Sequence, residues 1–268
     1  MIDYTSQAEQ YKRQIRDMLQ REAVSYRLIK VPKHGHVFTC GDQDPMVYVI
    51  ESGQIKLLSP SPEGKECLIA IYTAGDMFGE LCLCGQPVRL YTAVAMKDST
   101  LKQIPCGSLT AVLRREPPIG GLVQYLVARI AEQEQVISSL LTVNSERRLA
   151  LTLLRLAKQL GKQHPRSVCI DQKISQEELA EMVGTTRTRI GIFLKKFRAC
   201  GLIELSQERH LIVKEESVNQ YLERVALAEN SGTAGLQLQM SDFPKPIDFV
   251  RRGLRERGGN GNGEDPRQ

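Results

Sequence analysis

Residues 175–202, SQEELAEMVGTTRTRIGIFLKKFRACGL, carry the pattern of two short helices joined by a tight turn. Ser175 and Glu178 have the spacing of a capping box, which starts a helix by satisfying its free N–H groups from both sides. Gly184 follows the apolar stripe of this helix and is suited to the left-handed conformation that ends a helix. The stretch therefore predicts a first helix between a capping box and a glycine turn.

The second helix of this stretch is strongly basic. Thr185 or Thr186 caps it, and Gly201 closes it. Between Thr185 and Cys200 there is no acidic residue and there are five basic ones, namely Arg187, Arg189, Lys195, Lys196 and Arg198. A capped helix, a glycine turn and a basic helix form the helix-turn-helix pattern, whose second helix enters the DNA major groove. The pattern predicts DNA binding over the alternative, a helical hairpin with a solvated basic face.

Composition and length set the frame for this motif. At 268 residues the chain is long enough for two compact domains and a tail. The net charge of +5 is modest, so the basic character is local. The sequence has no apolar run of about 18 residues and no signal-peptide core, which predicts a cytoplasmic protein without a membrane segment. Seven cysteines without metal-ligand spacing are typical of free thiols in a reducing compartment.

The first half of the chain is rich in β-forming residues. Residues 4–28 have the pattern of an amphipathic lead-in helix or pair of helices. Residues 28–105 then carry short runs separated by glycine and proline: HVFTCG, MVYVIESG, IKLLSP, CLIAIYTAG, YTAVAM and STLKQIP. Runs at this close spacing predict a small sandwich or jelly roll.

A long helix is predicted from Pro117-Pro118 to about Val143. One heptad position carries Ile119, Leu126, Gln133 and Leu140, and its partner position carries Val123, Ile130, Ile137 and Asn144. This is a coiled-coil seam of about three and a half heptads, which a parallel dimer would bury. The alternative is a core helix packed on the sheet. Gln133, polar in the middle of the seam, favours a dimer in which it sets the register or contacts a ligand.

The last third of the chain continues the helix-turn-helix region. Residues 146–160 predict a helix and residues 161–167 a polar loop. Residues 202–205 and 210–213 flank a polar turn, which is the pattern of a β-hairpin wing. A short helix is expected around residues 217–228. The remaining residues are poor in apolar side chains, so the tail is predicted to be disordered.

In this order, the blocks resemble the cAMP receptor protein/FNR (Crp/Fnr) family of bacterial transcription regulators. The resemblance covers about residues 25–222 and rests on YVIESGQIKL, EGKECLIAIYTAGDMFGEL, the long helix, RRLALTLLRLAKQ and the helix-turn-helix with its wing. It implies an α+β fold with an N-terminal cyclic-nucleotide-binding β jelly roll, a long dimerisation helix and a C-terminal winged helix-turn-helix. It also implies a homodimeric regulator, not an enzyme, that binds a palindromic operator in double-stranded DNA.

The resemblance and the patterns together give the expected domains and their coupling. The domains are a helical lead-in at 1–24, a jelly roll at 25–115, a dimerisation helix at 116–144, a winged helix-turn-helix at 145–228 and a disordered tail at 229–268. A signal at the roll is expected to change the packing of the dimer helix and to reorient the recognition helices through a hinge near residues 143–145. In an activator, the loop at 161–167 would occupy the place where relatives contact RNA polymerase.

The resemblance implies an effector site at the phosphate-binding cassette of the family. The matching residues are Gly79, Glu80, Leu81 and Arg89. An arginine pairs with a cyclic phosphate, a glutamate accepts from a ribose hydroxyl, and a glycine allows close backbone approach. A cyclic nucleotide such as cAMP is therefore the effector that the cassette suggests.

The cassette departs from the family pattern. The interval between Glu80 and Arg89 is one residue shorter than in nucleotide-responsive members, and Leu90 stands where a serine or threonine is usual. Gln133 and Glu134 occupy the positions of hydroxyl residues that contact the purine. Three interpretations stay open: cAMP, another nucleotide, or a vestigial cassette in which Glu80 and Arg89 form a structural ion pair.

The cysteines suggest a further, thiol-responsive alternative. Cys82 and Cys84 lie beside the cassette, and alternate residues of a strand point the same way. A buried free cysteine that acts as a small hydrophobe is the more ordinary interpretation. No cysteine precedes Cys40, so the iron–sulfur cluster of one branch of the family is not expected, and no metal is expected either.

For DNA reading, the resemblance places the recognition helix over residues 186–198 and the base-reading positions on Arg187, Thr188, Ile192 and Lys195. Arg187 would clamp a guanine through O6 and N7, and Thr188 would touch a base edge or a thymine methyl. The family often has glutamate and arginine at the positions of Thr188 and Ile192, so a different operator is expected. Residues expected to contact phosphates, which gives affinity but no sequence information, are Gln176, Thr185, Arg189, Lys195, Lys196 and Arg198. Thr186, at the start of the recognition helix, is also expected to belong to the DNA-binding surface.

Two other classes of function compete with a DNA-binding regulator. A cupin-type metal enzyme would use His34 and His36, but such a site needs a third histidine, and none lies between His36 and His164. A nucleotide-sensing subunit that docks on protein would not need the five basic residues of the second helix. Both alternatives are therefore weaker than DNA binding.

Overall fold

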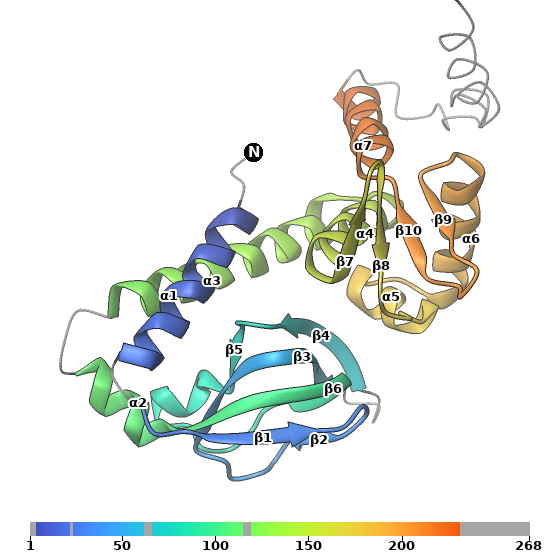
Figure 1. The fold of residues 1–268 in the computed structure, drawn as a ribbon. Coiled ribbons are helices and arrows are strands. Elements are labelled where there is room, and N and C mark those ends of the chain that lie inside the picture. Colours follow the sequence, from blue (N-terminus) through green and yellow to red (C-terminus); the bar gives the residue numbers. More distant parts are fainter. Residues whose placement is uncertain (1–3, 22–23, 62–65, 115–118, 231–268) are drawn as a thin grey trace, which may run out of the picture. The chain divides into compact units, whose positions relative to one another are not determined.

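The computed structural model describes residues 4–21, 24–61, 66–114 and 119–230. The described residues divide into two compact units, one up to Leu160 together with Ile174–Ile190, and one of Gly161–Lys173 together with the described residues from Gly191 onward. Figure 1 labels their helices and strands. The tail that the sequence predicts to be disordered lies outside the described residues from residue 231 onward. Within the described ranges, no helix has the length and apolarity needed to cross a bilayer.

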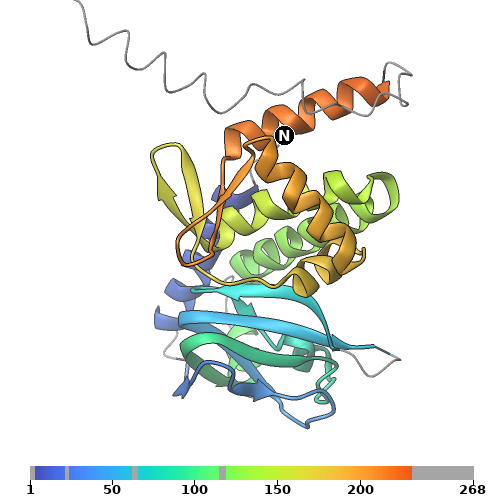
Figure 2. The same ribbon diagram turned by 90° about the vertical axis from the view of Figure 1, so that its right-hand side faces the viewer.

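The first unit is built on an antiparallel β roll, which confirms the predicted fold class. Two long strands, β3 (Met46–Pro60) and β6 (Thr92–Pro105), run side by side through it (Figures 1 and 2). The shorter strands complete the order β1-β6-β3-β4, with β2 added on β6 and β5 on β3. They are β1 (Arg27–Val31), β2 (His36–Phe38), β4 (Glu66–Thr73) and β5 (Met77–Phe78).

Each long strand joins two runs that the sequence predicts as separate strands. Gly53 lies inside β3 at a φ of 108°, and the pairing register with β6 shifts on both sides of it. A Cβ at Gly53 would lie 2.1 Å from Ser99 Oγ and 2.5 Å from Ser99 Cα. Gly53 therefore allows a β-bulge that lies close to the Ser99 backbone, where the sequence predicts a turn. A bulge and a turn can both require glycine, so the sequence does not separate them.

Helices cover one end of the roll. α1 (Tyr4–Arg21) packs along α3 (Ile119–Thr142) (Figure 1), and α2 (Cys106–Leu113) contacts the 3-10 helix η1 (Glu80–Cys84). One core cluster joins these elements to the strands through, among others, Ile15, Leu19, Val47, Ile104, Leu122 and Tyr125. The lead-in helix is shorter than predicted because the chain is already in strand β1 from Arg27.

The remaining elements form the region that follows α3. α4 (Ser145–Leu160) and α5 (Gln176–Val183) belong to the first unit, and α6 (Arg187–Ala199) begins there and continues into the second. The second unit contains a four-stranded sheet in the order β7-β8-β10-β9, followed by α7 (Glu215–Asn230). The strands are β7 (Gly161–His164), β8 (Ser167–Ile170), β9 (Ile203–Leu205) and β10 (Leu211–Val213).

The sheet of the second unit confirms the predicted wing and corrects one neighbouring prediction. Residues 161–167, predicted as a polar loop, form the β7–β8 hairpin. β8 buries Val168 and Ile170 and pairs with β10, whereas most of β7 is exposed. A polar edge strand has the composition of a loop, so the sequence alone does not separate the two.

Candidate functional site

The first helix of the helix-turn-helix is defined by its two ends. The Ser175 hydroxyl accepts from the Glu178 N–H at 3.1 Å, and the Glu178 carboxylate accepts from the Ser175 N–H at 2.9 Å. Burial alone would raise the pKa of Glu178, but the hydrogen bonds from Ser175 and the Lys56 ammonium together outweigh it, and the pKa lies below its ordinary value. Gly184 ends α5 at a φ of 66°. The predicted capping box and glycine turn are both confirmed.

The recognition helix α6 is also defined by its ends. Arg189 N–H lies 3.4 Å from Thr186 Oγ1, and Ile190 N–H donates to the Thr186 carbonyl. Thr186 is therefore the N-cap, which decides between the two threonines that the sequence offers. Gly201 follows the helix at a φ of 69°.

One side of α6 is buried and the other is open. Ile190, Leu194 and Phe197 are buried, and the Phe197 ring meets the Tyr221 ring of α7 edge-on at 5.5 Å. The predicted DNA-contacting residues lie on the remaining surface. Gln176, Thr186, Arg187, Thr188, Arg189, Ile192, Lys195 and Arg198 are exposed, and Thr185 and Lys196 are partly exposed. The arrangement leaves side chains that can donate to phosphates and base edges facing outward.

The junction between α3 and α4 contains a helix cap that the heptad pattern does not predict. α3 ends at Thr142, and the side chain of Asn144 accepts from the Arg147 N–H at 2.9 Å. Asn144 therefore caps α4. The heptad pattern places it on the seam of α3, and this prediction is wrong.

Arg148 ties three helices together at this junction. Its Nη1 donates to the carbonyls of Val143 at 2.6 Å and Leu140 at 3.3 Å, at the end of α3. Its Nε and Nη2 donate to the carbonyls of Val183 at 2.8 Å and Gly184 at 3.2 Å, at the end of α5. One guanidinium thus satisfies free carbonyls at two helix ends. The signal in the sequence is an arginine in the first turn of a helix, where the helix dipole disfavours a cation.

The cassette arginine is deeply engaged in the roll. The Arg89 side chain is 5 % exposed and forms an ion pair with Asp44, whose Oδ2 accepts from Nη2 at 2.8 Å and from Nε at 3.1 Å. Nη1 donates to the Gly79 carbonyl at 2.8 Å, Nη2 donates to the Met46 carbonyl, and the guanidinium lies 4.2 Å from the centre of the Phe38 ring. The structural ion pair suggested by the sequence exists, but its carboxylate is Asp44 and not Glu80.

The rest of the cassette lies next to this arginine. Gly79 has a φ of 84°, and a Cβ there would lie 2.8 Å from Arg89 Nη1 and 3.0 Å from the Met46 carbonyl oxygen. Glu80 and Leu81 follow in η1 and are partly exposed. Gln133 and Glu134 lie on α3 and are exposed. Position 79 therefore requires glycine, because the Arg89 guanidinium occupies the space that a side chain at this position would need.

The thiols beside the cassette are not arranged as the sequence suggests. Cys82 and Cys84 lie in the 3-10 helix η1 and not on a strand, so their side chains do not point in the same direction. Cys82 is buried and Cys84 is exposed. Burial, with a hydrogen bond to Cys106, raises the pKa of the Cys82 thiol to about 12. This environment fits the interpretation of Cys82 as a small buried hydrophobe.

We expect a thiol reagent to distinguish these two cysteines. Because the pKa of Cys82 rises from 9.0 to about 12, its thiolate fraction near neutral pH falls by roughly 10³-fold relative to a free thiol. Alkylation of the native protein with iodoacetamide, followed by peptide mass spectrometry, should modify Cys84 rapidly and Cys82 slowly. Urea should equalise the two rates. Rapid formation of a Cys82–Cys84 disulfide under a mild oxidant would instead support the thiol switch.

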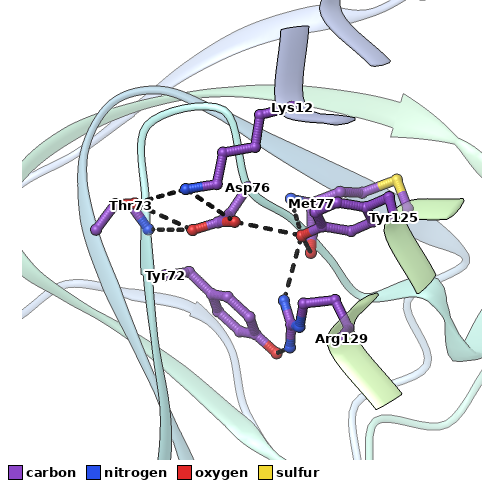
Figure 3. A network of polar contacts seen from close by, with 7 residues as sticks. All are labelled: Lys12, Tyr72, Thr73, Asp76, Met77, Tyr125 and Arg129. Atoms are coloured by element: carbon purple, nitrogen blue, oxygen red, sulfur yellow. Dashed lines mark hydrogen bonds and ion pairs between the residues drawn. The ribbon is translucent and has the colours of Figure 1, made fainter. Parts of the chain in front are cut away.

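A polar network anchors the segment that leads into the cassette (Figure 3). The Lys12 ammonium of α1 lies 3.2 Å from Thr73 Oγ1 and 3.4 Å from Asp76 Oδ1. Asp76 also accepts from the Thr73 N–H at 2.7 Å, which closes the turn between β4 and β5. The Tyr125 hydroxyl of α3 accepts from the Met77 N–H at 3.1 Å. The turn is thereby fastened to both helices.

Arg129 completes this network from the next turn of α3. Its Nη1 donates to the Tyr125 hydroxyl at 3.2 Å and its Nη2 to the Tyr72 hydroxyl at 2.7 Å, and the guanidinium lies 4.4 Å from the centre of the Tyr72 ring. Burial raises the pKa of both tyrosines, which therefore stay neutral donors and acceptors. The residues come from three distant segments, and no local pattern in the sequence announces them.

The exposed face of α3 differs in part from the predicted seam. Val123, Ile130, Ile137 and Leu140 are exposed as predicted, and Ile130 and Ile137 keep 54 % and 56 % of their surface. Leu126 instead packs against the core cluster of its own chain. Val127 and Leu141 are exposed and extend the apolar row, which therefore centres on positions 123, 130 and 137. The side chain of Ile119 lies outside the described residues.

The histidines of the alternative enzyme interpretation are both on the surface. His34 and His36 are exposed, and His36 lies on β2 opposite Val94. Among the residues that the structure describes, no group of three or more His, Cys, Asp or Glu side chains is arranged to hold a metal ion.

Comparisons with known proteins match this chain in two places. The cyclic nucleotide-binding domain family matches residues 28–116, and the Crp-like helix-turn-helix domain family matches residues 147–218. A CRP-like cAMP-activated global transcriptional regulator of Mycobacterium tuberculosis is 28% identical over 189 residues, 70% of this chain and 84% of the relative. The global nitrogen regulator of Synechococcus elongatus is 29% identical over 187 residues, 69% of this chain and 84% of the relative.

A solved structure shares the fold. A CRP/FNR-family transcriptional regulator from Thermus thermophilus superposes with a TM-score of 0.61 at 23% identity, over 74% of this chain and 98% of that one. Both sequence relatives are named as regulators, the M. tuberculosis one as a transcriptional regulator, in agreement with the expectation that the chain is not an enzyme. With both domain families matched in the order that the fold requires, the chain belongs to the Crp/Fnr family of bacterial transcription regulators.

Proposed function

We propose that this regulator works in the cytoplasm as a homodimer that reads a palindromic operator with α6 and answers to an effector at the β roll. The observation that carries the proposal is the open face of α6. Caps at both ends hold the helix, Ile190, Leu194 and Phe197 anchor it, and its basic side chains point outward. A helix of this kind inserts into the major groove and neutralises phosphates on either side.

DNA binding is tested by selection from a random double-stranded library at several salt concentrations. We expect an enriched motif with two half-sites and an affinity that falls steeply with salt. Arg187→Ala should lower discrimination at one base pair of each half-site by about 1–3 kcal/mol, whereas Arg198→Ala should weaken all sequences alike. Equal weakening of all sequences by Arg187→Ala would remove that residue from the base readers.

The proposed dimer is supported by the apolar row on α3. A helix face that leaves Ile130 and Ile137 more than half exposed, in line with Val123 and Leu141, is typical of a surface that a second copy covers. A parallel pair of α3 helices would bury this row along a single seam. It would also bring two α6 helices to successive major grooves about 34 Å apart.

We expect Ile137→Glu to convert the dimer into a monomer, because two carboxylates would face each other across the seam. Sedimentation velocity at micromolar concentration measures the change directly. Gln135→Glu is the matched control, since it adds the same charge to an exposed position of α3 away from the apolar row. A dimer that survives Ile137→Glu would place the interface elsewhere on the chain.

The effector is proposed to act at the cassette, through Glu80 and Leu81 of η1 and Gln133 of α3. A cyclic nucleotide is the class that the matched domain family supports. The M. tuberculosis relative is named as cAMP-activated, which supports cAMP as the first ligand to test. To use Arg89 as its phosphate partner, the ligand would have to displace Asp44 from the guanidinium.

The proposed route from effector to DNA passes through two sets of contacts. The network around Tyr125 and Arg129 links the turn before the cassette to α3. Arg148 links the end of α3 to α4 and α5. A shift of α3 would therefore reach the helix-turn-helix through a junction held by one side chain. In an activator, the β7–β8 hairpin is the proposed contact with RNA polymerase.

A further inference from the structure

The outward face of α6 has an apolar centre. A helix advances about 100° per residue, so Thr188, Ile192, Lys195 and Ala199 lie opposite the buried side formed by Ile190, Leu194 and Phe197. Ile192 stands in the middle of this face with 61 % of its surface exposed. An isoleucine so placed leaves most of its apolar surface uncovered by its own chain.

Basic residues lie on both sides of this centre. Arg189 and Lys196 fall on one flank of the helix, and Arg187 and Arg198 on the other, by the same helical spacing. Of these, Arg189, Lys196 and Arg198 can reach the phosphates on the two walls of a major groove. Arg187, the first residue of α6, remains the proposed guanine reader. Such a docking leaves Ile192 against the base edges at the floor of the groove.

The chemistry of the base edges limits what an isoleucine can recognise there. Guanine, cytosine and adenine offer hydrogen-bond donors and acceptors, which Ile192 can neither donate to nor accept from. Thymine offers a 5-methyl group, the apolar feature of the major groove. Other bases opposite Ile192 would lose water from polar edges without a replacement hydrogen bond.

We propose that Ile192 is a specificity-determining residue that selects a thymine, through its 5-methyl group, at the operator base pair facing the middle of α6. The proposal rests on the proposed function, because it requires α6 to lie in the major groove. It assigns one position of an operator that the sequence leaves unnamed. It also explains how this helix uses a position without any hydrogen-bonding group.

The experiment starts from the operator selected by the wild-type protein out of a random library. Each thymine of that operator is replaced singly by deoxyuridine, which removes only the methyl group. We expect one thymine per half-site to lose about four-fold in affinity, the effect of one buried methyl. In Ile192→Ala, thymine and deoxyuridine at that position should bind equally.

Two further variants make the test specific. Thr188 lies one helical turn from Ile192, so Thr188→Ala is the matched control. In this variant, the deoxyuridine penalty at the assigned position should persist. Ile192→Arg should change the selected base at that position to guanine, because arginine pairs with O6 and N7. Ile192 and Thr188 are both exposed, so all variants should melt like the wild type.

The outcomes separate this inference from the proposed function. If the wild type enriches no motif, the operator-reading function fails and the inference fails with it. If a motif is enriched but the methyl penalty survives in Ile192→Ala, or disappears in Thr188→Ala alone, the regulator stands and the assignment of Ile192 is overturned. An unchanged selected base in Ile192→Arg also overturns it.

Discussion

Replacing Arg89 by alanine is expected to lower the free energy of unfolding by about 3–5 kcal/mol, the usual effect of breaking a buried ion pair from one side. The Asp44 side chain is 16 % exposed, and its Oδ2 would lose both guanidinium donors and keep only the hydrogen bond from the Tyr48 hydroxyl at 2.9 Å. The carbonyls of Gly79 and Met46 would lose their donor, and the Phe38 ring would lose the guanidinium that covers it. Urea unfolding followed by circular dichroism measures the loss.

Matched variants show whether the pair is the cause. Arg89→Ala combined with Asp44→Ala should cost less than the sum of the single changes, because the double variant leaves no buried unpaired carboxylate. Arg89→Lys should not restore stability, since an ammonium lacks the planar set of donors that Asp44, Gly79 and Met46 share. An Arg89→Ala variant as stable as the wild type would contradict the structural role of Arg89.

The same residues test the effector. The test is titration calorimetry of the wild type and of Asp44→Asn with cAMP, cGMP and cyclic di-GMP. Asp44→Asn removes the carboxylate that pairs with Arg89 and leaves the positive charge of Arg89 in place. We expect the responding nucleotide to bind more tightly to Asp44→Asn, because it no longer competes with a carboxylate for the guanidinium. Tighter binding to the wild type would mean that Asp44 does not oppose the ligand.

Replacing Arg148 by alanine is expected to lower the free energy of unfolding by about 3 kcal/mol, since several charge-assisted hydrogen bonds to helix-end carbonyls are lost together. It should also loosen the junction between α3 and α4, because Val143 and Gly184 are then no longer held by one side chain. Limited proteolysis should cut faster near residues 143–145.

A second prediction for Arg148 concerns the coupling between effector binding and operator affinity. Core residues are not expected to affect this coupling. We expect Arg148→Ala to bind unrelated DNA normally but to lose the difference in operator affinity between effector-bound and free protein. Lys158→Ala is the matched control, because Lys158 is an exposed cation in the last turn of α4. Retained coupling in Arg148→Ala would show that the signal takes another route.

The helix-turn-helix was predictable in detail because its signals are local. The capping box of Ser175 and Glu178, the left-handed Gly184 and the basic helix after it depend on residues three to four positions apart. The roll was predictable only as a class. Gly53 signals a break in the strand, but only the neighbouring Ser99 decides that the break is a bulge within β3 and not a turn.

The seam of α3 shows where periodicity stops being sufficient. The heptad pattern places Leu126 and Asn144 on the seam, yet Leu126 packs into the core of its own chain and Asn144 caps the next helix. A single helix carries one apolar face toward the roll and another outward, and both contribute to the same periodic signal. Which residue belongs to which face depends on α1 and the roll.

The sequence by itself determined the family fold, the order of the domains and the basic second helix of the helix-turn-helix, because each depends on local spacing and chain order. Only the tertiary structure decided that the partner of Arg89 is Asp44, 45 residues earlier, and that Arg129 reaches Tyr72, 57 residues away. Charges and hydroxyls at such separations carry no mark of their partner in the sequence. Strand register and helix packing alone bring them within hydrogen-bonding distance.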